Sequence, residues 1–177
     1  IGIRITPIQN MRIACWTDSS LYGSEGEPLG DDDLQGFDKH KVYSQGGCVL
    51  GFMNRTQLEQ TDEVKVSFID WRSRASKRVH HSTFGAETGA ALEAVGMARY
   101  LRGFMCDILL GARRLLEVTD YGEEHLPIMV YTDCRSLFDN LKKDGSVPED
   151  KFVAVSVAAL RCAISAGPER NKDKAEC

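Results

Sequence analysis

The sequence lacks any long hydrophobic run. No apolar stretch approaches the roughly 18 residues that span a bilayer as a helix, and the first residues do not follow the charged-then-apolar plan of a signal peptide. We therefore expect a soluble, intracellular chain with no membrane partner. Positive charge is not in excess either, because 22 Lys and Arg are outnumbered by 26 Asp and Glu, for a formal net charge of -4. This balance argues against a generally cationic nucleic-acid coat protein.

Several metal-binding and catalytic signatures are also missing. The six cysteines include no Cys-x-x-Cys pair, and most of them lie in apolar runs, where a thiol behaves as a small hydrophobic group. The sequence has no Gly-x-x-x-x-Gly-Lys loop, no Gly-x-Ser-x-Gly elbow and no His-Glu-x-x-His helix. These absences argue against a zinc site, a nucleoside-triphosphate hydrolase, a serine hydrolase and a zinc protease.

The chain nevertheless contains enough apolar material for one core. Its 177 residues are 42% hydrophobic, 27% charged and 8% aromatic, which is typical of a single ordinary domain. We expect this domain at 11–166, with an acidic loop insertion at 23–39. Residues 1–10 are expected to be a linker from an upstream region, and 167–177 a polar tail. Because the chain begins with Ile1 rather than Met, we expect it to be a piece of a longer polypeptide.

Hydrophobic periodicity predicts a mixed α/β layer fold. The expected strands are 11–17, 46–52, 64–71 and 128–132. The expected helices are 82–101, a second apolar stretch to about 116, 136–143 and 149–166. The first three strands should be antiparallel, with polar residues 54–63 closing a hairpin between the second and third. A helix crossover then leads to the further strand.

Two of the expected strands end in the same dipeptide. Thr17-Asp18 and Thr132-Asp133 each place a carboxylate where an apolar run meets a turn, and ligand sites in α/β sheets favour such strand ends. An Asp at a strand end also begins turns or caps helices, which is the alternative for either residue taken alone. The coincidence of the two favours a site.

A third carboxylate lies on the helix expected from residue 82. Glu87 shares one helical face with Ala91 and Ala94, so it should point toward the core. An unpaired carboxylate there would cost on the order of several kcal/mol, so we expect it to be neutral, hydrogen-bonded or coordinated to a cation. A favourable interaction with the first turn of its own helix is the alternative. Glu93 lies off this face and should be a solvated surface residue.

Asp18, Glu87 and Asp133 are therefore candidate catalytic residues and metal ligands. Their oxygens are hard donors with no set of His and Cys beside them, which suits Mg²⁺ or Mn²⁺. Two such ions about 4 Å apart polarise a phosphodiester, generate a hydroxide and stabilise the leaving oxygen. The residues thus predict metal-dependent phosphodiester hydrolysis.

The stretches around these carboxylates resemble one family. Cys-Trp-Thr-Asp-Ser-Ser (15–20), Ser-Thr-Phe-Gly-Ala-Glu-Thr-Gly-Ala-Ala-Leu-Glu-Ala (82–94) and Val-Tyr-Thr-Asp-Cys-Arg-Ser-Leu (130–137) are similar, in this order, to motifs of the ribonuclease H domain of Ty1/copia-type retrotransposon polyproteins. The resemblance covers most of 11–166 and implies a ribonuclease H-like mixed sheet flanked by helices. It also implies that the three matched carboxylates bind two metal ions and cleave the RNA strand of RNA/DNA hybrids during reverse transcription. The implied partners and places are a reverse transcriptase domain in the same polyprotein, and the cytoplasm or a virus-like particle.

The sequence departs from that family at two points. An Asp often stands there at the position of Ser156, and a fourth carboxylate follows a last strand to which the tail 167–177 would lead. Asp173 lies in a polar run without apolar neighbours and is not expected to replace it. A second hypothesis is therefore a catalytically inactive ribonuclease H-like connection or partner-binding domain. A third is an unrelated metal-dependent phosphotransfer or nuclease domain.

A basic segment without acids, 71–81, precedes the Glu87 helix. Arg and Lys side chains in such a segment hold nucleic-acid phosphates. The expected substrate-binding residues are Arg72, Arg74, Lys77 and Arg78. Trp71 would stack or pack beside them, and His80 and His81 are expected to be exposed loop imidazoles. The alternative is a solvated connection without a substrate.

Overall fold

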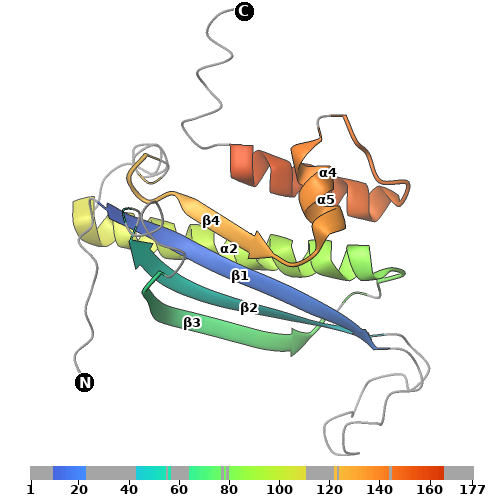
Figure 1. The fold of residues 1–177 in the computed structure, drawn as a ribbon, viewed down its shortest axis with the longest axis horizontal. Coiled ribbons are helices and arrows are strands. Elements are labelled where there is room, and N and C mark those ends of the chain that lie inside the picture. Colours follow the sequence, from blue (N-terminus) through green and yellow to red (C-terminus); the bar gives the residue numbers. More distant parts are fainter. Residues whose placement is uncertain are drawn as a thin grey trace, which may run out of the picture.

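The described part of the chain forms a four-stranded sheet with helices beside it (Figure 1). This computed structural model describes residues 10–22, 43–54, 56, 64–76, 78, 80–110, 122, 124–143 and 145–165. The elements are β1 (Met11–Tyr22), β2 (Tyr43–Asn54), β3 (Val66–Ala75), α2 (Thr83–Leu110), β4 (Ile128–Thr132), α4 (Arg135–Lys142) and α5 (Lys151–Ser165). The expected insertion 23–39 and tail 167–177 lie outside the described residues, as does the expected linker except for residue 10.

The strand order is β3-β2-β1-β4, which confirms the predicted mixed sheet. β1 and β2 are antiparallel, β2 and β3 are antiparallel, and β4 is parallel to β1. A parallel neighbour requires a crossover, and α2 lies between β3 and β4 in the chain to provide it. This mixed α/β architecture, with a four-stranded sheet flanked by three helices, is compatible with a ribonuclease H-like fold.

The main core lies between the sheet and α2. Alternate residues of β1 face the helix, and Met11, Ile13 and Cys15 are all at most 2% exposed. Ala94 and Ala98 meet them from α2 and are fully buried. Because alanine side chains are small, the helix backbone lies close to the strands. Burying each large apolar side chain contributes about 1.5–3 kcal/mol.

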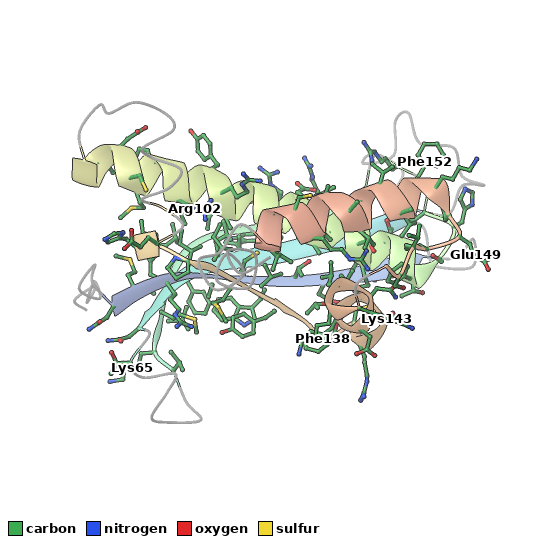
Figure 2. The ribbon with its side chains drawn as sticks, turned by 90° about the horizontal axis from the view of Figure 1, so that it is seen from above. Lys65, Arg102, Phe138, Lys143, Glu149 and Phe152 are labelled. Carbon is green, nitrogen blue, oxygen red and sulfur yellow. The ribbon has the colours of Figure 1, made fainter. Side chains whose placement is uncertain are left out.

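A second apolar cluster joins α4 and α5 to the first half of α2. Leu137 of α4 and Leu160 of α5 are fully buried and pack with Ala91 and Val95 of α2. Figure 2 shows α5 lying alongside α2, with the labelled Phe152 near the beginning of α5. The helices after β4 therefore hold the beginning of α2 against the sheet.

Several boundaries differ from the sequence prediction. β1 continues through Tyr22, and β3 continues through Ala75, so the beginning of the basic segment is strand and not loop. Most side chains in these two extensions are polar. A prediction based on alternating hydrophobic residues therefore does not detect them. α2 is one continuous helix to Leu110 where two helical stretches were expected.

The described cysteines are free thiols, as the absence of paired motifs predicts. Cys15, Cys48 and Cys106 are buried in the core. Burial, with a smaller contribution from neighbouring Cys48, raises the pKa of Cys15 to about 12. None of the helices in the described ranges is both long enough and apolar enough to cross a membrane.

Candidate metal centre

Asp18, Glu87 and Asp133 converge on one point. One carboxylate oxygen from each residue lies within 4.8 Å of those from the other two. β1 and β4 are parallel and pair Thr17 with Thr132, so the Asp that follows each Thr lies beside the other Asp. Asp18 is inside β1, opposite Gly47, and not at a strand end as expected. Asp133 follows directly after β4.

Local hydrogen bonds fix the segments that carry two of these carboxylates. The Gly85 N–H donates to the Ser82 hydroxyl at 3.1 Å, so Ser82 caps α2 and sets where Glu87 falls in its early turns. The Cys134 N–H donates to the Thr132 hydroxyl at 3.1 Å. This bond closes the turn after β4, where Asp133 stands.

Glu87 is the buried member of the cluster. It is 4% exposed, whereas Asp18 and Asp133 are exposed. Its Oε1 accepts a hydrogen bond from the Ser19 N–H at 3.2 Å, and its Oε2 has no hydrogen-bond partner. Burial raises the pKa of Glu87, the contacts with Ser19 lower it, and the charges of Asp18 and Asp133 raise it further. The net effect is a raised pKa, so an added cation would stabilise the charged form.

The arrangement fits a hard divalent cation. The group consists of carboxylates alone, which are the donors that Mg²⁺ and Mn²⁺ prefer. The unpartnered Oε2 of Glu87 is buried in this group, and a buried carboxylate oxygen without a partner is costly. A cation held by the three residues would supply the missing partner.

Two of the expected substrate-binding arginines are paired with an acid. Arg72 and Arg74 lie on β3, and their guanidinium groups contact Oε1 of Glu93 at 2.7 and 2.5 Å. The expectation that Glu93 is merely solvated is wrong, because its side chain is only 33% exposed and it joins α2 to β3. Arg and Glu at this spacing face each other only when β3 packs beside α2, which the sequence pattern does not reveal.

The rest of the basic segment is partly described. Arg78 is exposed, and its backbone N–H donates to the Ser76 hydroxyl at 3.1 Å. Lys77 lies outside the described residues. Trp71 is 74% exposed. None of these positions contradicts phosphate binding, and that role stays a prediction.

His80 differs from its expected place. His81 is exposed as predicted, but His80 is half-buried, and its Nε2 lies 3.1 Å from the Ser76 hydroxyl. The imidazole packs on α2 where Gly89 has no side chain, since a Cβ there would come within 2.9 Å of the ring. Burial, followed by the charge of Arg78, lowers the pKa of His80, while Asp150 opposes the shift.

Ser156 lies on α5 beside a cavity of about 490 Å³ that His80 and Arg78 also line. Its hydroxyl donates to the Phe152 carbonyl of its own helix at 3.1 Å. The family that the sequence resembles often has an Asp at this position. Here the position holds a serine whose hydroxyl already has a hydrogen-bond partner within α5.

Comparisons with known proteins do not assign the chain to a family. No protein-family model matches it, and no curated protein matches it. Among solved structures it is similar to the protease-reverse transcriptase of prototype foamy virus, at 10% identity and a TM-score of 0.29, over 94% of this chain and 22% of that chain. The likeness to this retroviral protein is too weak to carry an argument, and the site rests on its own geometry.

Proposed function

We propose that this chain is the ribonuclease H domain of a copia-type retroelement polyprotein, which hydrolyses the RNA strand of RNA/DNA hybrids with divalent metal ions. One observation carries the proposal: oxygens of Asp18, Glu87 and Asp133 lie within 4.8 Å of one another, with the buried Oε2 of Glu87 unpartnered. The motifs around these residues support the same reading. A reverse transcriptase domain in the same polyprotein would be the partner.

Each carboxylate has a distinct part in this proposal. Asp18 of β1 would contribute to the ligand sets of both ions, while Glu87 and Asp133 would each complete one of these sets. Bound Mg²⁺ or Mn²⁺ would supply Lewis-acid polarisation of the phosphodiester. Because Glu87 is anchored through Oε1 by Ser19, its other oxygen is held in place before any ion arrives.

The decisive variant is Asp18→Asn. It removes a charge at an exposed position of β1, so we expect loss of Mg²⁺-dependent hybrid cleavage to background, without unfolding. Cleavage of a labelled hybrid should be measured with circular dichroism of the same sample. Asp107→Asn, at an exposed position of α2, is the matched control and should cleave like the wild type. Full cleavage by Asp18→Asn would contradict the proposed role.

The inactive alternative has one observation in its favour. Arg72 and Arg74 are paired with Glu93, so less of the basic segment is free for phosphates than the sequence indicates. Hybrid binding by the wild type without cleavage in Mn²⁺ would favour a connection or partner-binding domain. Cleavage of duplex DNA or a small phosphate ester, with hybrids ignored, would favour an unrelated phosphotransfer or nuclease domain.

A further inference from the structure

β3 is the outermost strand of the described sheet, and it pairs with β2 on one side only. Residues 68–75 of this strand are all exposed. They include two large aromatic side chains, Phe68 and Trp71, which are 73% and 74% exposed. A long exposed strand edge with apolar side chains is a template for pairing with another strand.

The backbone groups of Trp71 face this open edge. The N–H of Ser76, which follows β3, donates to the Ser44 carbonyl of β2 at 2.7 Å. Because the hydrogen-bonding groups of an antiparallel strand alternate between its two sides, every second residue from Trp71 to Ala75 turns its groups away from β2. The Trp71 N–H accordingly donates to the carboxylate of Asp70, at 2.8 Å, and this side chain would release it to an incoming strand.

The side chains of this edge are divided between two faces. Asp70 and Arg72 line a cavity of about 670 Å³ together with residues of α2, so both lie on the α2 side of the sheet. Trp71 stands between them in the sequence, and successive residues of a strand point to opposite faces. One face of the edge thus carries an acid and a base, and the other carries an exposed indole.

We propose that β3 pairs with β3 of a second copy of this chain, antiparallel and centred on Trp71. The two-fold axis then places Asp70 of each copy opposite Arg72 of the other, which gives two attractive cross-strand pairs. On the other face the two Trp71 side chains lie opposite each other, and aromatic cross-strand pairs are favourable. The inference makes no use of the metal centre and goes beyond the proposed function.

Charge selects this register over its neighbours. Only residues whose backbone groups face outward can bond across the new edge, so the neighbouring registers pair Trp71 with Ser73, or Ser73 with itself. The first of these places the two Arg72 side chains opposite each other, and the second places Arg72 opposite Arg74. Like charges directly opposite each other are destabilising.

Arg72 also has positive charge that its own chain does not balance. Arg72 and Arg74 both contact Oε1 of Glu93, so two guanidinium groups share one carboxylate. Asp70 of a second copy, opposite Arg72, would balance this excess. The charges of the edge therefore complement a second copy of the same edge.

The experiment is sedimentation velocity of the full chain at concentrations from micromolar to millimolar. Because β3 has only 10 residues, the contact is small, and the wild type should pass from monomer to a weak dimer within this range. Asp70→Arg and Arg72→Asp each place like charges opposite each other and should weaken association about tenfold or more. Trp71→Ser, which leaves the charges unchanged, should weaken it as well.

A mixture of the two charge variants tests the pairing itself. Asp70→Arg and Arg72→Asp should associate with each other although each associates poorly alone, because the mixed dimer restores two pairs of opposite charge. Asp107→Arg and Arg99→Asp make the same changes in charge at exposed positions of α2, and each should dimerise like the wild type. Circular dichroism melting of every variant establishes that it is folded.

A wild type that stays monomeric up to millimolar concentration overturns the proposal and leaves the edge to a strand of another protein. Dimerisation of either charge variant at wild-type strength overturns the register, as does a mixture of the two folded charge variants that does not associate. If Arg72→Asp does not fold, an unchanged dimer of Trp71→Ser overturns the register instead.

Discussion

His80 is a half-buried base in a segment of exposed cations, and its burial predicts a dependence of stability on pH. Burial and the charge of Arg78 lower the pKa of His80 below its usual 6.5, so the folded chain binds this proton less readily than the unfolded chain. The stabilisation is present above that value and is lost as the pH falls through 6.5 toward the lowered pKa. We expect the melting temperature to drop over this interval.

The matched variants are His80→Gln and His81→Gln. The first should flatten the dependence of the melting temperature on pH below 6.5, and the second is the control at the adjacent, exposed imidazole. A steep decline that survives in His80→Gln would assign the effect to another group.

The sequence predicts the site residues whose positions follow from a repeated sequence pattern. The helical period placed Glu87 toward the core, and two similar dipeptides marked Asp18 and Asp133. The contact of Ser19 with Glu87 could not be found in this way, because it is a property of the folded site and not of the strand sequence. The pairing of Glu93 with Arg72 was missed for the same reason.

At the scale of one element, the glycines of α2 predict opposite results from the same substitution. Gly96→Ala meets nothing within 4 Å, so it should stabilise the chain by about 1 kcal/mol through helix propensity. Gly89→Ala places a Cβ 2.9 Å from the His80 ring, which would have to move away from Ser76. We therefore expect Gly89→Ala to be less stable than Gly96→Ala in urea unfolding. Equal gains in stability would show that the imidazole shifts at no cost.

Strands and helices were predicted where side chains alternate between water and a core. β2, β4, α4 and α5 are near their expected positions for this reason. β3 escaped full prediction because its last residues, including Arg72 and Arg74, are exposed on an edge strand and show no apolar alternation. An edge strand is held by backbone pairing and by charged contacts, and a hydrophobic pattern is insensitive to both.

At the scale of the whole molecule, Glu93 links the edge strand to the main helix and also masks two positive charges. The Arg72, Arg74 and Glu93 side chains are 43%, 49% and 33% exposed, so solvent screening makes the contribution of the contact to stability small. Glu93→Gln should therefore lower the free energy of unfolding only slightly. It should also tighten hybrid binding, because it frees two guanidinium groups in a chain of net charge -4.

Hybrid affinity should be measured across a salt series. Freed arginines that contact phosphates would steepen the fall of affinity with salt in Glu93→Gln, by about one unit of slope for each new contact. Glu124→Gln, an exposed acid that makes the same change in net charge, is the control. An unchanged slope in Glu93→Gln would exclude Arg72 and Arg74 from the phosphate contacts.

β4 pairs directly with β1, although β2, β3 and α2 lie between them in the sequence. The contact between Asp18 and Asp133 is therefore a contact between distant segments of the chain. Pairings between distant segments form slowly. A chain still emerging from the ribosome carries Asp18 and Glu87 long before Asp133, and it has an incomplete ligand set until β4 docks. If the chain has the proposed activity, cleavage would therefore report completed folding, and the nascent polypeptide could not cut the RNA around it.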